Sequence, residues 1–116
     1  MSVRLSSFLE KISGTNLTPG MDISGIQIEG GYVSDLLSDV MGSAQPQQVW
    51  ITIMKHMKVI AVASMTGIPC IVFAKESIPD EAVIKKAIDE GICLFSSDKS
   101  VFEISGILYL LLHQSQ

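Results

Sequence analysis

The sequence predicts an α/β fold with three layers, in which a mostly parallel sheet lies between two layers of helices. Between residues 49 and 113, short apolar runs alternate with longer stretches of helical periodicity. The runs are apolar throughout, as expected of strands that are buried on both faces. With 116 residues and 47% apolar content, the chain has the length of one domain and enough apolar side chains for one core. We therefore expect a single domain over residues 1–116.

The first expected element is an amphipathic helix at Ser2–Ser13, which Gly14 is placed to end. Its apolar residues repeat at helical spacing: Leu5, Phe8, Leu9 and Ile12. Residues 15–21 contain turn-forming residues such as Asn16 and Pro19, so they are expected to be a connector that could include one short extended piece.

The next stretch is expected to contain a strand and then a helix. Ile23, Ile26 and Ile28 predict the strand, and Gly30 with Gly31 is expected to stop it. A helical stripe follows: Val33, Leu36, Leu37, Val40 and Met41. Tyr32-Val33 could instead prolong the strand, and this alternative is left open.

The second half of the chain is more regular. Strands are predicted at Val49–Ile53, Cys70–Ala74 and Ile92–Phe95, and helices at His56–Met65, 79–90 and Val101–His113. Pro79 suits the first turn of the middle helix, and Gly91 closes it. The turn Ser96-Ser97-Asp98 has capping ability for the last helix, after which residues 114–116 are expected to fray.

Composition excludes several classes of function. The net charge of −4, from 8 basic and 12 acidic residues, argues against a nucleic-acid partner. No apolar stretch approaches the roughly 20 residues of a membrane span, and Met1–Ile12 does not read as a signal peptide. We expect a cytoplasmic protein with no membrane partner.

The two cysteines, Cys70 and Cys93, form no CxxC motif, and the histidines are His56 and His113. These ligands are too few and too scattered for a zinc site or an iron–sulfur cluster. We expect no metal and no cofactor, and we interpret both cysteines as small core thiols.

The stretch Gly30–Met41, followed by the alternating strands and helices up to Leu112, resembles the DRTGG domain family. The resemblance covers roughly residues 23–112 and leaves 1–22 as an N-terminal helix and connector. Pro79-Asp80 before a helix, and Ile92–Phe95 before Ser96-Ser97, lie in the order of the family pattern. In this family the module occurs alone, beside CBS domains and inside phosphotransacetylases, and it is similar to the N-terminal domain of HPr kinase/phosphorylase.

The chain departs from the residues that name the family. Met54-Lys55-His56-Met57 stands where the pattern has Asp-Arg, and Lys75-Glu76-Ser77 stands where it has Thr-Gly-Gly. The resemblance implies a non-catalytic regulatory or interaction module. The resemblance to members of the family that occur as stand-alone proteins also implies that this chain is an accessory in a hydrogenase or signalling-kinase system.

A ligand site is expected at the carboxyl ends of the predicted strands, where parallel α/β sheets bind ligands. The candidate binding residues are Gly30, Gly31, Asp35, His56, Lys75, Ser96 and Ser97. Gly30-Gly31 before a helix could present backbone N–H groups to a small anionic metabolite, with Lys75 or Lys99 supplying charge. The pattern matches neither GxGxxG nor GxxxxGK[ST], so ordinary capping and turn chemistry is the simpler interpretation of these residues.

No catalytic residue is predicted. His56 beside Lys55 could be a general base, but no nucleophile and acid can be paired with it, so a surface histidine is the simpler interpretation. Asp35 and Asp39 lie four residues apart on one predicted helix face, and two carboxylates alone do not complete a calcium or magnesium site.

The last predicted helix indicates a second buried surface. Leu108–Leu112 is apolar nearly all round the helix, which exceeds what one packed face of a small monomer requires. A homodimer is the simplest explanation, and three methionines in or near the His56–Met65 helix indicate an adaptable surface for an unknown protein partner. We thus expect a regulatory module, with a metabolite or nucleotide sensor as the alternative and an iron–sulfur or redox accessory protein as a second alternative.

Overall fold

The computed structural model describes residues 1–114, so the predicted fraying of residues 115 and 116 lies outside the described part. Within that part, strands and helices alternate along most of the chain. Their order is β1 (Val3–Arg4), α1 (Leu5–Ile12), β2 (Thr15–Asn16), β3 (Gln27–Ile28), β4 (Gly30–Val33), α2 (Leu37–Ser43), β5 (Gln48–Thr52), α3 (Lys58–Thr66), β6 (Cys70–Phe73), α4 (Glu81–Glu90), β7 (Cys93–Ser96) and α5 (Val101–His113).

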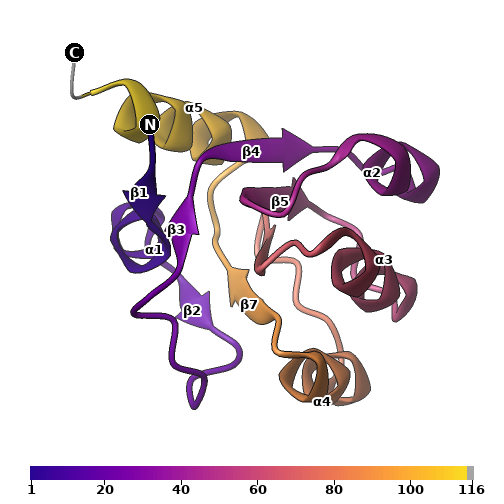
Figure 1. Cartoon of the computed structure of the whole chain (residues 1–116). Helices are drawn as coiled ribbons and strands as arrows, with labels where there is room; N and C mark the ends of the chain where they lie inside the picture. Colours follow the sequence, from indigo (N-terminus) through magenta and orange to yellow (C-terminus); the bar gives the residue numbers. More distant parts are fainter. Residues whose placement is uncertain (115–116) are drawn as a thin grey trace.

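The main sheet has five strands in the order β2-β7-β6-β5-β4 (Figure 1). Strands β4, β5, β6 and β7 are parallel neighbours in chain order, and β2 is antiparallel to β7. The short strands β1 and β3 form a separate antiparallel pair. The predicted mixed α/β fold with a mostly parallel sheet is confirmed.

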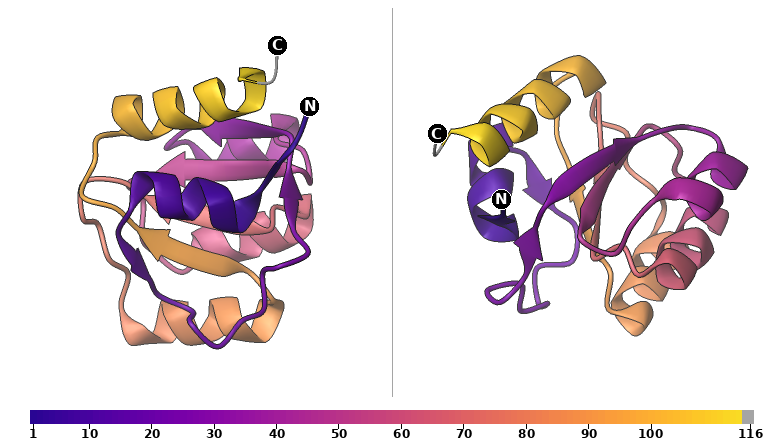
Figure 2. Two further views of the ribbon diagram at one scale, coloured as in Figure 1. Left: turned by 90° about the vertical axis from the view of Figure 1, so that its left-hand side faces the viewer. Right: turned by 45° about the horizontal axis from the view of Figure 1, so that its top comes forward.

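Each face of the sheet is covered by helices. Helices α1 and α5 cover one face, and α2, α3 and α4 cover the other (Figure 2). Alternation along each strand sends successive side chains to opposite layers. In β5, for example, Val49 and Ile51 pack under α1 and α5, whereas Trp50 packs under α2 and α3. Burial on both faces explains the continuous apolar runs within these strands, which are Val49–Ile51 in β5, Cys70–Phe73 in β6 and Cys93–Phe95 in β7.

Two helices end at glycines, and one of these, Gly91, is predicted from the sequence. Gly91 closes α4 in the left-handed region, with φ 72° and its N–H donated to Ala87 and Ile88 carbonyls. Gly67 closes α3 in the same way, with φ 78°. Glycine adopts this conformation without the Cβ clash that other residues meet there.

The predicted strand around Ile23–Ile28 and the stop at Gly30-Gly31 are wrong in position. Only Gln27–Ile28 of that stretch is a strand, and Gly30–Val33 forms β4 itself. The alternative in which Tyr32-Val33 belongs to a strand is therefore the correct one. The helix predicted from Val33 begins only at Leu37.

Smaller differences concern where helices begin. The first helix begins at Leu5 rather than Ser2, because Val3 and Arg4 pair with β3. Pro79 lies outside α4, whose N-cap is Asp80, and the side chain of Asp80 accepts a hydrogen bond from the Val83 N–H. The cap of α5 is Ser100 rather than the predicted Ser96-Ser97-Asp98 turn.

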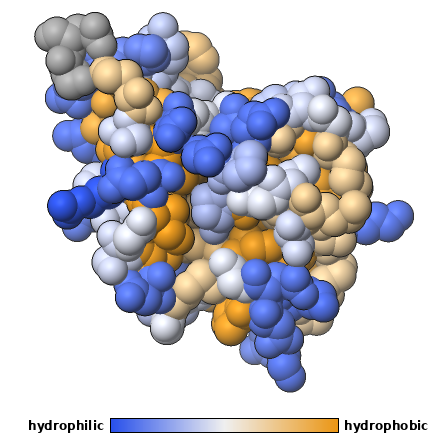
Figure 3. Space-filling view, in the orientation of Figure 1, coloured by the Kyte–Doolittle hydropathy of each residue, from blue (hydrophilic) through white to orange (hydrophobic). Residues whose placement is uncertain are grey.

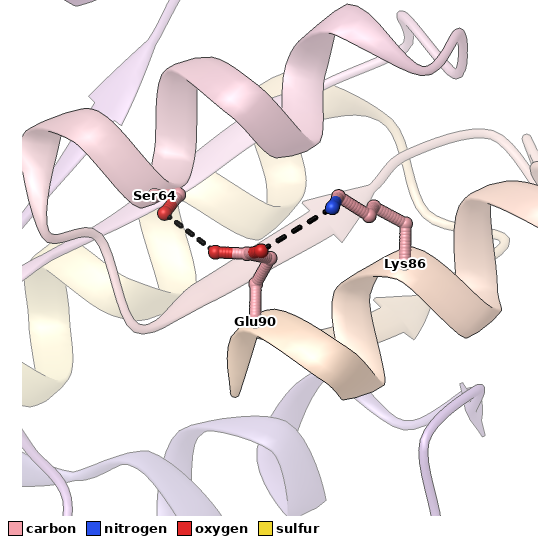
Figure 4. Close-up of polar contacts among 3 residues, drawn as sticks. All are labelled: Ser64, Lys86 and Glu90. Carbon is pink, nitrogen blue, oxygen red and sulfur yellow. Dashed lines mark hydrogen bonds and ion pairs between the residues drawn. The ribbon is translucent and has the colours of Figure 1, made fainter.

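Helices α3 and α4 are linked by one exposed carboxylate (Figure 4). Glu90 accepts a hydrogen bond from the Ser64 hydroxyl at 2.9 Å and lies 3.4 Å from the Lys86 ammonium. The hydrogen bond from Ser64, together with Lys86, lowers the pKa of Glu90. The contact joins neighbouring helices on one face of the sheet.

Among residues 1–114, no helix combines the length and apolar character that crossing a membrane requires. On the face shown in Figure 3, hydrophobic side chains are interrupted by hydrophilic ones.

Candidate functional site

The carboxyl ends of the four parallel strands meet at one edge of the sheet. Five of the predicted site residues lie at this edge or in the loops that leave it: Asp35, His56, Lys75, Ser96 and Ser97. The structure therefore brings these five to one edge, as the strand pattern predicts.

Gly30 and Gly31 do not lie there. They begin β4, so they are at the opposite edge, and the predicted position directly before a helix is wrong because α2 begins only at Leu37. A Cβ on Gly31 would lie 2.7 Å from the Leu108 Cδ2. The glycine thus lets α5 pack directly against the backbone of β4.

Asp35 holds the ends of β4 and β5 together. Its carboxylate accepts hydrogen bonds from the Thr52 hydroxyl at 2.5 Å and from the Ile53 N–H at 3.2 Å. The Thr52 hydroxyl also accepts from the Met54 N–H at 3.2 Å. Asp35 and Asp39 form no carboxylate pair, because Asp39 instead accepts from the Tyr32 hydroxyl at 2.9 Å, which raises the pKa of Tyr32.

The two predicted serines also hold loops in place. Buried Ser96 donates to the Ser77 carbonyl at 3.2 Å, and Ser77 donates to the Ile53 carbonyl at 3.1 Å. Buried Ser97 accepts from the Lys99 N–H at 3.2 Å. These bonds connect the loops that follow β5, β6 and β7.

The ammonium of Lys99 ends helix α1. It donates to the Ile12 carbonyl at 2.8 Å and lies 3.4 Å from the Ser13 hydroxyl. A cation at a helix carboxyl end is favourable, because the last carbonyls lack partners within the helix. Lys99 therefore has a structural role, whereas Lys75 and His56 are exposed to solvent.

A polar cavity of about 260 Å³ lies beside β7 at this edge. Its lining comes from the end of α1, the start of β2, the loop after β6 and the end of β7: Ser13, Gly14, Thr15, Glu76, Ile78, Ser96 and Asp98. Two carboxylates and three hydroxyl groups therefore surround one small space.

The backbone around this cavity is strained. Among residues 1–114, the non-glycine residues with positive φ are Ser13 (52°), Lys75 (58°) and Glu76 (56°). Two of these three line the cavity and the third adjoins it. Hydrogen bonds from the Lys75 N–H to the Lys99 carbonyl, and from the Glu76 N–H to the Ser97 carbonyl, hold the loop in this shape. Backbone strain of this kind clusters at ligand-binding sites.

The strand order of the sheet differs from that of α/β sheets with a ligand crevice. Ligand crevices in open α/β sheets form where strand order reverses and helices pass to opposite faces. Here β4 to β7 follow one another, and the helices between them lie on one face. The carboxyl edge has no such crevice among these strands, and the cavity exists because β2 adds beside β7.

A second cavity, of about 300 Å³, lies at the opposite edge between β4 and α5. Gly30 and Gly31 line it, together with Ser105, Tyr109 and His113. The Ser105 hydroxyl is buried and has no hydrogen-bond partner among the described residues. The two predicted glycines therefore belong to a different pocket from the other five residues.

The two cysteines lie side by side in the core. Cys70 and Cys93 are register partners on β6 and β7, and both side chains are buried. The hydrogen bond to Cys93 and burial in the apolar layer hold the pKa of Cys70 well above its usual value. Among the described residues, no group of three or more His, Cys, Asp or Glu side chains could hold a metal ion.

Comparison with known proteins adds one finding. The chain is similar to the crystal structure of the CBS and DRTGG domains of the regulatory region of Clostridium perfringens pyrophosphatase, complexed with the activator diadenosine tetraphosphate. The TM-score is 0.74 over 90% of this chain, at 12% sequence identity. The two share a fold. The chain spans 45% of the length of that pyrophosphatase chain.

At 12% identity, the likeness to the pyrophosphatase regulatory region concerns the fold alone. The matched chain belongs to the regulatory region of that pyrophosphatase. No protein-family model matches the chain, and no curated protein matches it.

Sequence reasoning missed the contribution of Ser13, Gly14 and Thr15 to the edge. These residues reach it because β2 pairs with β7 across 80 positions of sequence, for example Asn16 with Phe95. A two-residue strand has too little periodicity to be found from sequence. The one local signal is Gly14, whose Cβ would lie 2.1 Å from the Ser96 carbonyl oxygen.

Proposed function

We propose that residues 1–116 form one DRTGG-like domain that works as a non-catalytic regulatory module. It binds a small metabolite in the polar cavity at the carboxyl edge of the sheet. The proposal is carried by that cavity of about 260 Å³, which three segments distant in sequence enclose with strained backbone. The fold shared with a regulatory region supports the same class of function.

The cavity lining restricts the chemistry of the ligand. Glu76 and Asp98 are acceptors when ionised, and the hydroxyls of Ser13, Thr15 and Ser96 can donate or accept. A ligand with hydroxyl or amine donors satisfies the carboxylates directly. A small anion is compatible if it contacts Lys75, which is exposed on the same loop, or if it arrives with a divalent cation.

The proposal is tested by measuring the melting temperature of the protein in the presence of each member of a ligand panel. The panel contains inorganic phosphate, acetyl phosphate, mononucleotides, diadenosine tetraphosphate, polyols, polyamines and Mg²⁺. A ligand at about 100 times its dissociation constant stabilises the folded state by about 2.7 kcal/mol, a shift of roughly 10 °C. A panel in which every member leaves the melting temperature unchanged contradicts the proposal for these ligand classes.

Two matched variants locate the site. Glu76→Gly and Lys75→Gly each replace a side chain at positive φ by glycine, so both relieve the same kind of strain. Only Glu76 lines the cavity. We expect both variants to fold, Glu76→Gly to lose the ligand-induced shift, and Lys75→Gly to retain it. The reverse result would indicate an anion held by Lys75 outside the cavity.

A nucleotide sensor is the second candidate. It is favoured by the diadenosine tetraphosphate bound in the pyrophosphatase regulatory region. The nucleotide members of the same panel test it, because a shift confined to them distinguishes a nucleotide sensor from a sensor of another metabolite.

We also propose that two copies of the chain pair, as the apolar last helix predicts. An accessory role in a hydrogenase or signalling-kinase system stays a prediction of the family resemblance. The iron–sulfur alternative has only two cysteines, whereas such clusters take four protein ligands.

A further inference from the structure

Helix α5 exposes an apolar face to solvent. Phe102 is 86% exposed, Tyr109 64% and Leu110 68%. At 100° per residue these side chains share a sector of about 100° with Gly106 and His113. The buried side of α5 faces the opposite way and consists of Ile104, Leu108 and Leu112.

Gly106 lies in the middle of this exposed face. A glycine inside a helix is less favourable than alanine by about 1 kcal/mol. Apart from the neighbouring backbone of α5 itself, nothing among residues 1–114 lies within 4 Å of a Cβ placed on Gly106, whereas a Cβ on Gly31 would collide with Leu108. Packing within one copy therefore explains Gly31 and leaves Gly106 unexplained.

We infer that two copies of this chain pair through α5, with the two helices antiparallel and crossing at Gly106. The inference rests on the pairing proposed above and specifies its surface. A bare glycine at the crossing lets the two helix backbones approach closely. A two-fold axis at this residue makes the same patch serve both copies, as a symmetric dimer requires.

The spacing of side chains about Gly106 suits this arrangement. Phe102 and Leu110 lie four residues before and after Gly106, so each faces the other across the axis. Glu103 and Tyr109 lie three residues before and after it, so the carboxylate of one copy faces the phenol of the other. A parallel arrangement would instead place the two Glu103 carboxylates against each other.

Charge favours a second copy over a charged partner. The chain carries a net charge of −4, so two copies repel each other over most of their surfaces. The exposed face of α5 has Glu103 at its border and no other carboxylate or ammonium group, and the adjoining hollow between α1 and α5 adds only the Lys11 ammonium. A basic or acidic partner would find no matching set of charges there.

The exposed area is close to what a specific dimer needs. Covering an aromatic side chain buries about 150–250 Å². At 86% and 64% exposure, Phe102 and Tyr109 supply about 300 Å² per copy, or about 600 Å² for two copies. Leu110, His113 and the adjoining hollow between α1 and α5 add to this, toward the roughly 1,000 Å² of a specific interface.

Static light scattering over a range of concentrations, with melting temperatures of the same samples, tests the inference. Wild-type protein is expected to reach twice the chain mass of 12.5 kDa. Gly106→Ala is expected to melt at a higher temperature when monomeric, because alanine favours the helix. The same methyl group obstructs the crossing, so the dimer dissociation constant should rise roughly tenfold or more. A purely structural glycine cannot produce these opposite effects.

Two control variants match the test variants. Gly42→Ala changes another exposed helical glycine with open space at its Cβ, and it should leave the dimer unchanged. Leu110→Lys should abolish the dimer, whereas Ile88→Lys, at a 52% exposed position on α4, should not.

Each other outcome overturns part of the proposal. If wild-type protein at about 100 µM has the mass of one chain, pairing of two copies is overturned altogether. Coverage of α5 by a different protein is one case of this outcome. A wild-type dimer that Leu110→Lys leaves intact overturns the α5 surface. A dimer that Leu110→Lys abolishes but Gly106→Ala leaves intact overturns the crossing point. None of these results alters the ligand-induced melting shift, which tests the metabolite site separately.

Discussion

The start of α5 depends on two side chains that satisfy each other. The Ser100 hydroxyl accepts a hydrogen bond from the Glu103 N–H at 3.1 Å, and the Glu103 carboxylate accepts from the Ser100 N–H and hydroxyl at 3.1 Å each. This capping box provides acceptors for backbone N–H groups that have no partner within the first turn of a helix. Hydrogen bonds from Ser100 lower the pKa of Glu103 below its usual value of about 4.5.

This shift predicts a pH dependence of stability. Because the folded-state pKa of Glu103 is depressed, its charged form stabilises the fold above about pH 4.5, and this contribution is lost as the pH falls through the lower folded value. Glu103→Gln keeps an acceptor for the capping box and does not titrate. Its free energy of unfolding, measured in urea from about pH 6 to about pH 3, should fall less steeply than that of the wild type. Parallel curves would contradict the prediction.

Some pH dependence of the free energy of unfolding should persist in the Glu103→Gln variant. Hydrogen bonds from Ser24 lower the pKa of Asp22, and Ser64 with Lys86 lowers that of Glu90. These two carboxylates titrate with the same sign and are unaffected by the substitution.

At the scale of elements, the contact between α5 and β4 sets the shape of one face of the sheet. Leu108 is buried against the backbone of Gly31, and both line the cavity beside β4. The contact explains why glycine occupies the second position of β4, since glycine is otherwise unfavourable in a strand.

Substitution of the two neighbouring glycines should separate packing from strand propensity. Gly31→Ala forces Leu108 to move, and overpacking of this kind costs about 1–3 kcal/mol. Gly30→Ala is the matched control, since its Cβ would lie 3.7 Å from the Gln48 side chain, an ordinary contact. Urea unfolding should show Gly31→Ala as the less stable variant, and equal stabilities would refute the packing argument.

At the scale of the whole molecule, helices on both faces of the sheet shield its central strands. Cys70 and Cys93 lie side by side on β6 and β7, fully buried beneath α1 and α5. A thiol reacts through its thiolate, and the raised pKa of Cys70 disfavours that form. The hydrogen bond with Cys70 lowers the pKa of Cys93, so burial is what protects the Cys93 thiol.

We expect neither thiol to react in the folded protein. A colorimetric thiol reagent should label no cysteine before unfolding and two cysteines in concentrated denaturant, because both thiols are buried and reduced. Rapid labelling of the folded protein at neutral pH would show that the α1–α5 layer opens readily. Cys70→Ala distinguishes which thiol reacts in that case.

The sequence alone was sufficient wherever a segment carries its own periodicity and its own stop signal. The final helix was predicted at Val101–His113, as observed, and the buried strands β5, β6 and β7 were predicted within one residue at each end. Together these elements define the α/β class. They also place Asp35, His56, Lys75, Ser96 and Ser97 at a common edge, since parallel strands end together.

The tertiary structure alone decided what depends on contacts between distant residues. The local sequence Gly30-Gly31 predicts the end of a strand. In the structure these glycines begin β4, because β5 pairs with them and α5 packs on their backbone. Thr15-Asn16 carries no strand pattern, yet it adds to β7 and encloses the polar cavity. Local patterns report the conformational preference of a few neighbouring residues, whereas strand pairing and helix packing are decided by the whole chain, so the position of the cavity emerges only once the chain is folded.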